Sequence, residues 1–492
     1  MTNTQSNDVF PHAYGNEFES AIMLATKGDD GEWCPVPEHR VPHELLRHVP
    51  ERPPGVSGGF LQNGYRAYVD DAHLEVCTPE AASPSGVAAA IRGTDLLIEQ
   101  TVRRYLADSP EQVHHMARLQ KRVVDSNGVR WGSHDNFDIS SRLAAQLERP
   151  NSPERRALLV HLMTRSAVVG AGYIGPRGMR FAQKIDGLMV ISGHLHNGSM
   201  FRLARDAGLE TRARLEVRCG DANVSDWATW MRFGSAALLL ALLELGEVSQ
   251  FVREDLLDHE RDILKGAMTR NAISADETHR LAADHLGSSL GFQRSIAEAA
   301  LHRLPAVADA SSEYYRVAEE LLAFCDDMER VRRRGAEVLS LADRADWPIK
   351  LHAIQAAFAK NPRLSQRDPG TVWKTLAEVL DRRYDETRIV SYGGVVVEEQ
   401  YGWGLRRRDE GAYRLRVPLA RAKAYSYFPE PGTRAAVRAG LMRRYVIGQC
   451  DWDRIAVQAV GVREIPILLR DVRQSQLDEM QVQALSMAER HF

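Results

Sequence analysis

The segment 227–246, WATWMRFGSAALLLALLELG, is apolar on nearly every side of the helix that its spacing predicts. Such a helix has no polar face to turn toward water, so other elements must enclose it. Its longest apolar run, 236–245, is about half the length that a membrane-spanning helix needs. Gly246 follows the last apolar turn, where glycine commonly ends a helix. The chain must therefore build a large core, and its 492 residues allow two or three domains.

The bulk composition favours a soluble intracellular protein. The formal net charge is -3, from 63 basic and 66 acidic residues, which argues against bulk electrostatic binding to nucleic acid or to an anionic membrane. The five cysteines are scattered and form no C-x-x-C pair, which fits a reducing cytosol and argues against a zinc knuckle or a disulfide framework. The first ten residues are polar and show no signal peptide. We therefore expect a cytoplasmic protein.

The order of elements predicts an α+β protein. Strand signals concentrate before about residue 225, whereas 250–385 is helical and charged. Residues 83–107 begin with Ser-Pro and continue with apolar residues at helical spacing. We place a boundary near 410, which predicts a large domain at 1–410 and a small C-terminal domain at 411–492.

The stretch PHAYGNEFES puts two carboxylates two residues apart, at Glu17 and Glu19. In a strand these side chains share one face. Two carboxylates so close repel each other unless a cation lies between them. Taken alone, the pair also fits two surface charges on an edge strand, so the cation hypothesis needs support from elsewhere in the chain.

A second acidic cluster lies in AYVDDAHLEVCTPE, within the strand predicted at 64–80. Strict alternation puts Tyr68 and Asp70 on one face but His73 and Glu75 on the other. If all four serve one site, a bulge or bend at 71–72 must reset the phase.

Further polar residues follow at turns and strand ends. After the Asn-Gly turn signal at 127–128, His134 and Asn136 fall on a predicted strand, and 172–186 is a predicted Gly/Pro-rich loop. In CGDANVSD, Asp221 and Asn223 directly precede a helix. Each has an ordinary structural explanation as a helix cap, a turn or a satisfied core residue. The H-x-H at 194–196 has no third ligand nearby in sequence, so we interpret it as a surface turn.

Together these motifs resemble the Pup ligase and Pup deamidase (depupylase) family, carboxylate–amine ligases related to glutamine synthetase and glutamate–cysteine ligase. The resemblance covers roughly residues 11–455, in the family's order. Its individual motifs are short, but their collinear order is specific. The matching stretches are GNEFE, NGYRAYVDDAHLEVCTPE, GSHDNF, AQKID, GDANVSDWATWMRFGSAALLLALLE, DWPIKL, DRRYDE, PGTRAAVRAGLMRRY and DWD.

The resemblance implies a curved antiparallel sheet of the glutamine-synthetase type, with helices on its convex face and ATP and Mg²⁺ on its concave face. Glu17 and Glu19 match the family's first-strand acidic pair, whose members coordinate magnesium. Tyr68 and Glu75 match further residues of that metal cluster. Asp70 matches the catalytic aspartate, the base that deprotonates an incoming amine or activates water.

The resemblance also implies a nucleotide site. His134 and Asn136 fall where the family places groups near the nucleotide, and Arg202 aligns with a phosphate-facing arginine. Arg434, in PGTRA, matches an arginine of the C-terminal domain, and Trp452 is a ring beside the nucleotide. The implied partners are a carboxylate donor, in one version a small disordered Pup-like tail, and an amine acceptor.

Several positions depart from the family. K-N-N is replaced by Lys-Arg-Val at 121–123, and the N-T-R-D-E-P-H run keeps only Arg202. S-Q-R-x-D has Ala182 and Lys184 in place of serine and arginine, and lysine lacks the bidentate fork of arginine. Asp70 follows Glu19 by 51 residues, which leaves no room for the long depupylase loop. The residues implied to bind metal are therefore retained, whereas those implied to contact the phosphate and the substrates have changed.

Three functions remain open at this point. The first is an ATP- and Mg²⁺-dependent carboxylate–amine ligase that forms an amide or isopeptide bond through an acyl phosphate. The second is a deamidase or isopeptidase of the same fold, in which Asp70 activates water. The third is a non-catalytic nucleotide-binding homologue. The missing loop favours the first over the second, and the retained acidic residues disfavour the third.

Overall fold

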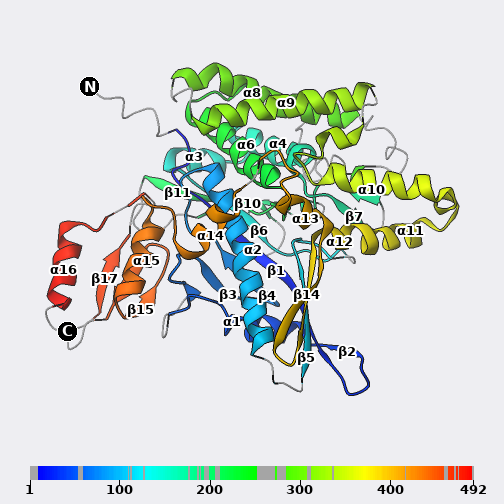
Figure 1. The fold of residues 1–492 in the computed structure, drawn as a ribbon. Coiled ribbons are helices and arrows are strands. Elements are labelled where there is room, and N and C mark those ends of the chain that lie inside the picture. The colour runs from blue at the N-terminus through cyan, green and yellow to red at the C-terminus, as the bar shows by residue number, and fades with distance from the viewer. Residues whose placement is uncertain are drawn as a thin grey trace.

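The computed structural model describes residues 9–489, apart from 54–58, 109, 111–112, 126–127, 176–177, 186–187, 189, 193–198, 205–210, 252–271, 274–283, 307–311, 335–336, 416, 459–463, 470–472 and 475. An 11-stranded sheet lies at the centre of the molecule (Figure 1). Its strands are β1 (Tyr14–Lys27), β2 (Trp33–Pro35), β3 (Arg66–Asp70), β4 (His73–Cys77), β5 (His114–Gln120), β6 (Ser133–Ser140), β9 (Val190–Ser192), β10 (Ser199–Ala204), β11 (Arg212–Val217), β13 (Glu386–Tyr392) and β14 (Val395–Tyr401).

The main path of this sheet runs β14-β13-β5-β1-β6-β11-β10-β9, and β2, β3 and β4 lie off it. All its pairings are antiparallel except that of β9 with β10. The mixed α+β fold with a large antiparallel sheet is thus confirmed. The long strand β1 organises the sheet, because its first half pairs with β4 and β6 and its second half with β2 and β5.

The segment predicted as one strand at 64–80 is a hairpin of β3 and β4. Its two-residue turn is Asp71-Ala72, and Asp71 has a φ of 46°, a left-handed conformation that aspartate tolerates better than most residues. Tyr68 pairs with Glu75, and Asp70 with His73. A hairpin turn, rather than a bulge, therefore resets the phase where the sequence required it, and all four side chains share one face.

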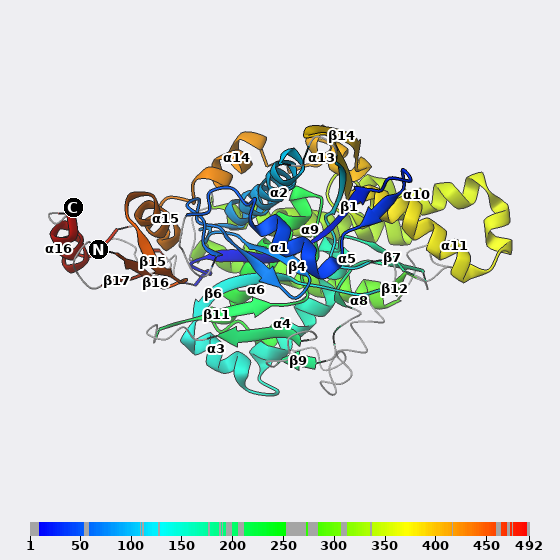
Figure 2. The ribbon, with the colours of Figure 1, turned by 90° about the horizontal axis from the view of Figure 1, so that it is seen from below.

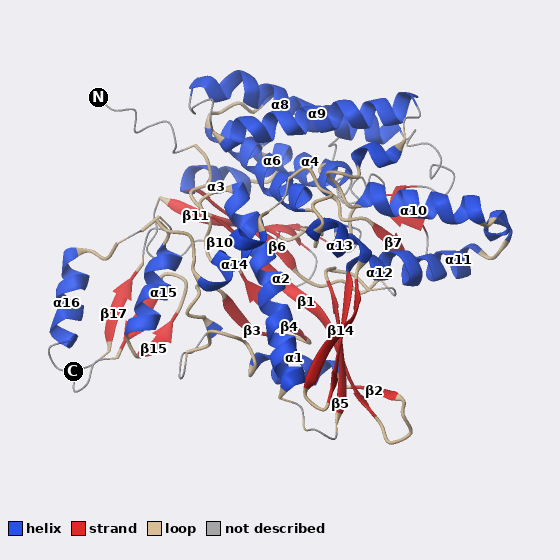
Figure 3. Ribbon diagram, in the orientation of Figure 1, coloured by secondary structure: helices blue, strands red, loops and turns tan. Residues whose placement is uncertain are grey.

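Helices cover the sheet and form the main core (Figures 1 and 3). Helix α2 (Pro84–Ala107) is capped by Ser83 and packs against β1, β5, β13 and β14. The apolar helix α6 (Asp226–Glu244) is buried almost throughout, among α4 (Pro153–Thr164), α8 (Asp284–Arg303) and α9 (Glu313–Arg334). Among the described residues, the sheet and its surroundings also include the α-helices α1 (Val41–Leu46), α3 (Ser141–Glu148), α5 (Ser166–Val169), α10 (Trp347–Lys360), α11 (Pro369–Leu376), α12 (Arg382–Asp385) and α13 (Trp403–Asp409).

Within the described residues, no helix combines the length and the apolar character that a membrane span requires. The loop predicted at 172–186 is corrected in part, since it contains the short strands β7 (Tyr173–Gly175) and β8 (Gly178–Arg180). These strands form a small sheet with β12 (Ala272–Ile273). Glycine and proline indicated a loop, but the buried Ile174 and Met179 anchor the segment as a hairpin against the core.

The C-terminal part forms a further three-stranded sheet, seen beside the main body in Figure 2. Its core is separate from the main core, and its buried members other than Phe60 all come from Leu441 onward. The buried Ala422 and Tyr425, by contrast, belong to the main core. The domain boundary near 410 stays a prediction. The elements here are α14 (Leu419–Tyr427), α15 (Arg434–Arg444), β15 (Ile447–Cys450), β16 (Arg454–Val457), β17 (Ile465–Leu468) and α16 (Glu479–Glu489).

Candidate active site

Two glutamates of β1 lie on one face of the sheet, as their spacing predicts. Glu17 is opposite Cys77 of β4 on one side and His134 of β6 on the other. Glu19 is opposite Glu75 of β4. Strand register therefore brings side chains from β1, β3, β4 and β6 into one cluster.

The first half of this cluster is acidic. Glu19, Asp70 and Glu75, called here the Glu75 group, each offer a carboxylate oxygen, and these three atoms all lie within 4.8 Å of one another. Burial and the nearby Glu17 carboxylate raise the pKa of Glu75 to about 9. Burial also raises the pKa of Tyr68, whose side chain faces Glu75 across the hairpin. Such closely spaced oxygens are the hard ligands that Mg²⁺ binds, and a divalent cation there would offset their repulsion.

The second half mixes carboxylates with a histidine. Glu17, His134 and Glu216, called here the Glu17 group, also offer ligand atoms within 4.8 Å of one another. Nδ1 of His134 lies 3.2 Å from Oε2 of Glu17 and 3.5 Å from Oε1 of Glu216. Asn136 donates to Glu17 over 3.3 Å.

Arginines surround the Glu17 group. Arg214 contacts Glu17 at 3.0 Å, whereas Arg202 and Arg218 contact Glu216 at 3.0 and 3.2 Å. Burial alone would raise the pKa of Glu17, but His134 and Arg214 outweigh it and hold the pKa at about 2. The protein itself thus supplies positive charge to this group.

Gly132 gives Glu19 its space. A Cβ at this position would lie 2.2 Å from Oε1 of Glu19 and 3.2 Å from Nε2 of His134. The carbonyl of Gly132 also accepts the backbone N–H of Glu19 at 3.0 Å. The glycine of GSHDNF therefore lets β1 and β6 approach with the carboxylate between them.

A pocket begins at Glu17 and extends away from the Glu75 group toward the C-terminal sheet. Gly15 and Asn136 line it from β1 and β6, and Arg434 and Trp452 line it from the C-terminal part. Three of the residues expected near the nucleotide thus border one pocket. The other two, His134 and Arg202, instead contact the carboxylates of the Glu17 group.

Arg434 is already engaged by a buried ion pair. Its Nε donates to Oε1 of Glu80 at 2.7 Å, and Arg438 donates to Oε2 of the same carboxylate at 3.0 Å. Burial opposes the charge of Glu80, but Arg438 and Arg434 hold its pKa at about 2. Glu80 follows β4 closely, so this contact ties the strand of Glu75 to α15. Arg438 also lies over the ring of Trp452, 5.4 Å from its centroid.

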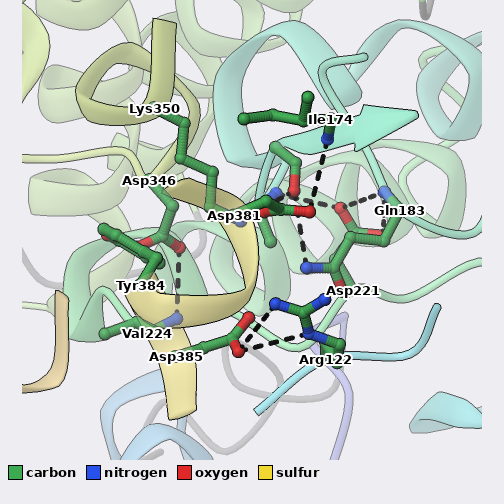
Figure 4. A network of polar contacts seen from close by, with 12 residues as sticks. Arg122, Ile174, Gln183, Asp221, Val224, Asp346, Lys350, Asp381, Tyr384 and Asp385 are labelled. Carbon is green, nitrogen blue, oxygen red and sulfur yellow. Dashed lines mark hydrogen bonds and ion pairs between the residues drawn. The ribbon is translucent and has the colours of Figure 1, made fainter. Parts of the chain in front are cut away.

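A buried polar network supports the site (Figure 4). The carboxylate of Asp221 accepts the backbone N–H groups of Ala171, Gln183 and Lys184 at 2.9–3.2 Å. This holds the loop that carries Lys184, whose side chain interacts electrostatically with Glu19 and Arg218. Burial lowers the pKa of Lys184 to about 8, although Glu19 opposes this.

The departure at 121–123 has a structural explanation in the same network. Arg122 forms a buried pair with Asp385 at 2.9 Å, and Lys121 contacts Asp95 at 2.6 Å. Elsewhere in this network, the carboxylate of Asp346 accepts the backbone N–H groups of Val224 and Ser225. Lys121 and Arg122 therefore pair with a part-buried and a buried carboxylate, those of Asp95 and Asp385.

The sequence analysis missed Glu216, Arg214 and Arg218. Their signal was present, because charged residues alternate with apolar ones along 212–218, RARLEVR, and so share one face of a strand. Without the register of β11 against β6, that face could not be assigned to the site. The H-x-H at 194–196 lies outside the described residues.

Comparison with known proteins gives one family. Residues 29–456 match the model of the Pup-ligase protein family. The chain is 25% identical over 423 residues to a Pup deamidase/depupylase of Mycobacterium tuberculosis strain CDC 1551, covering 83% of this chain and 76% of that protein. It is 27% identical over 489 residues to a Pup--protein ligase of Bifidobacterium longum subsp. infantis, covering 94% of this chain and 92% of that protein.

Solved structures agree on the fold. The complex between the prokaryotic ubiquitin-like protein Pup and its ligase PafA superposes with a TM-score of 0.73 and 18% identity, covering 99% of this chain and 94% of that chain. The ligase PafA in complex with ADP superposes with a TM-score of 0.66 and 19% identity, covering 93% and 94%. At these identities the likeness establishes the shared fold.

Proposed function

The chain belongs to the Pup-ligase family, and from that premise we propose that it is an ATP- and Mg²⁺-dependent carboxylate–amine ligase. The family's relatives bear ligase and deamidase names at about the same identity, so names alone do not choose the direction. The choice between ligase and deamidase therefore rests on the residues of this chain's own candidate site.

The order of groups along β1 carries the proposal. The pocket borders Gly15 and Glu17, the Glu75 group follows at Glu19, and Asp70 stands exposed at the end of the hairpin. A nucleotide in the pocket would direct its phosphates toward the carboxylates. Asp70 then lies at the far end, where a second substrate can enter from solvent.

This order suits condensation through an acyl phosphate. The terminal phosphoryl group of ATP passes to an oxygen of the donor carboxylate, which leaves ADP and an activated acyl group. The amine nitrogen then attacks the acyl carbon, and phosphate departs with the electrons of the C–O bond. Bound magnesium would neutralise phosphate charge during this transfer, and Glu17, Glu19, Tyr68 and Glu75 would hold it.

Asp70 is the proposed base. An amine reaches the site protonated, and an adjacent carboxylate can accept its proton. Asp70 is exposed on β3, opposite His73, and shares the face of Glu19 and Glu75. Within this proposal Arg202, Arg434 and Trp452 contribute to nucleotide binding with His134 and Asn136, and the donor is a glutamate-type carboxylate such as the end of a Pup-like tail.

The test is ADP release from Mg-ATP in the presence of paired carboxylate donors and amines, with the amide product identified by mass spectrometry. Donors would include a Pup peptide ending in glutamate and free glutamate. ADP release and amide formation that both require donor and amine would support the ligase. Nucleotide binding without turnover of any pair would indicate a non-catalytic homologue.

A hydrolytic reaction is the second candidate. Deamidases occur among the relatives, and the exposed Asp70 can also reach water. A Pup peptide ending in glutamine distinguishes the two. Its conversion to glutamate with release of ammonia, without net ATP consumption, would identify a deamidase instead.

A further inference from the structure

A further cavity lies on the face of β1 opposite to Glu17 and Glu19. Phe18 and Ser20 line it, and along a strand these residues alternate with the two glutamates. The cavity has about 520 Å³ of empty space, part of it open to solvent. None of the described residues that line it also lines the pocket at Glu17. The cavity is therefore separate from the candidate active site.

The cavity lies where β1 changes its neighbours. Up to Ser20, β1 pairs with β4 and β6, whereas from Ala21 onward it pairs with β5 and β2. Helices α2 and α13 contribute the buried side chains of Ile98 and Leu405 to the wall. Together with the largely buried Phe18 ring, these side chains give the cavity an apolar part.

Three side-chain donors of the cavity wall are directed to carboxylates of the protein. Lys121 and Arg408 both contact Oδ2 of Asp95, at 2.6 and 2.7 Å. The side-chain amide of Gln120 donates to Oε2 of Glu386 at 2.7 Å. An anionic ligand would have to compete with these carboxylates for the donors, which disfavours such a ligand.

One carboxylate of the wall is only half satisfied. Arg122 donates to Oδ1 of Asp385 through Nε at 3.2 Å and through a terminal nitrogen at 2.9 Å (Figure 4). Within the part of the chain that the structure describes, Oδ2 of Asp385 has no hydrogen-bond partner, although the residue is only 1% exposed. Burial raises the pKa of Asp385, and Arg122 and Lys350 offset this only in part. A buried acceptor without a donor is unfavourable, and a positively charged donor would correct both deficits.

We propose that this cavity binds a small organic amine. The ammonium group donates to Oδ2 of Asp385, and the apolar part of the molecule packs against the side chains of Ile98 and Leu405. Sites for small molecules commonly combine an apolar wall with a few polar groups that fix the orientation of the ligand. The bound amine would also touch Phe18, which lies between the two glutamates of β1 in sequence. The binding itself does not depend on which reaction Asp70 performs.

Fluorine NMR measures this binding directly, on the full chain and without turnover. The probe is 4-fluorobenzylamine, and the comparison probes are 4-fluorotoluene, which lacks the donor, and 4-fluorobenzoate, which is an anion. We expect saturable binding of the amine alone, with a Kd that is roughly millimolar for so small a molecule. Mg-ATP should leave this Kd within about twofold, because the nucleotide is proposed to bind in the other pocket. Displacement of the amine by Mg-ATP would overturn the proposal.

Variants locate the binding. Asp385→Asn should weaken it roughly tenfold or more, because the charge-assisted hydrogen bond is lost. The matched control is Asp381→Asn, which removes an equally buried carboxylate, paired with Lys350 at 2.5 Å, that does not line the cavity. It should leave the affinity within about twofold.

A second variant tests the cavity without changing any charge. Ile98→Phe places a larger side chain in the wall and should weaken binding by roughly fivefold. Circular dichroism verifies that each variant is folded, and if Asp385→Asn is not, Ile98→Phe decides the question. Unchanged affinity in the folded variants, or equal binding of 4-fluorotoluene or 4-fluorobenzoate, would overturn the proposal. The absence of saturable binding would do so as well, since solvent alone would then fill the cavity.

Discussion

Glu17 and Glu75 are the same residue type on the same face of the sheet, yet their carboxyl groups shift in opposite directions. The pKa of Glu17 is held at about 2, whereas that of Glu75 is raised to about 9. Both are largely buried, so burial alone does not separate them. The difference lies in their neighbours: Glu17 contacts Arg214 and His134, whereas Glu75 faces further carboxylates.

This contrast divides the candidate site by charge environment. The Glu17 group carries its own positive charge and is stable as an ionised cluster. In the Glu75 group, His73 lies 3.4 Å from Glu19 and Lys184 interacts with Glu19, yet burial and Glu17 still raise the pKa of Glu75 to about 9. This group would therefore gain more from a cation from solution. The second arrangement suits the proposed binding and release of metal with the nucleotide, because the raised pKa of Glu75 shows that the fold resists a negative charge there.

The largest expected effect concerns Asp70, the proposed base within the Glu75 group. Asp70→Asn should lower turnover by roughly 10³-fold, because a general base typically contributes about 10²- to 10⁴-fold. Nucleotide affinity, measured by calorimetry, should stay within a few-fold. The neighbouring Asp71→Asn is the control, since asparagine also tolerates the left-handed φ of 46° there. Full activity in Asp70→Asn would exclude Asp70 as the base.

Removing the charge of Glu17 should destabilise the metal-free protein. The folded-state pKa of about 2 lies below the ordinary 4.5, so this carboxylate stabilises the fold above pH 4.5 and ceases to do so as pH falls toward 2. Glu17→Gln should therefore cost about 2 kcal/mol at pH 7, with the loss vanishing in acid. Denaturant unfolding in EDTA at several pH values measures this. An unchanged stability at pH 7 would show that Arg214 does not compensate Glu17.

For Glu75→Gln the expected change in the stability of the metal-free protein has the opposite sign. Its raised pKa means that ionisation is resisted in the fold, a penalty absent below pH 4.5 that grows as pH rises toward 9. Glu75→Gln should therefore stabilise the metal-free protein by about 1–2 kcal/mol at pH 7 and abolish stabilisation by Mg²⁺. Thermal unfolding with and without Mg²⁺ gives both results, and destabilisation of the metal-free variant would contradict the contrast.

Metal binding should depend on pH through the same carboxyl group. Because Mg²⁺ requires the ionised form, its affinity should rise by roughly tenfold per pH unit from neutrality until pH approaches about 9. Calorimetry in two buffers of different ionisation enthalpy would detect proton release on binding. A pH-independent affinity with no proton release would remove Glu75 from the ligand set.

The smallest effect tests geometry without changing charge. The Cβ of Gly132→Ala would enter the space of Oε1 of Glu19, a flexible side-chain end that can move aside. Mg²⁺ affinity should fall by roughly fivefold while the free energy of unfolding changes little. Gly440→Ala, where nothing lies within 4 Å, is the control. Equal Mg²⁺ affinity in both variants would show that the position of Glu19 is not critical.

Much of the fold followed from local patterns. The bounds of α2 and α6 fall within a residue or two of the predicted helices, because capping residues and apolar spacing act within a few turns. The shared face of Glu17 and Glu19 followed from the two-residue period of a strand. The hairpin at 64–80 was harder to predict, since the alternation of side chains showed only that their facing must be reset at 71–72 if all four serve one site.

The sequence by itself determined the family, the acidic pair of β1 and the buried helix. Each rests on side-chain order or on short-range periodicity, which need no knowledge of distant partners. Only the tertiary structure decided that Glu216 and Arg214 join Glu17, and that Glu80 engages Arg434. Those contacts join residues 197 and 354 positions apart, for Arg214 with Glu17 and for Arg434 with Glu80. Strand register and burial set these contacts, and the register of β1 against β4 and β6 places Glu17 and Glu75 among the neighbours that shift their pKa values in opposite directions.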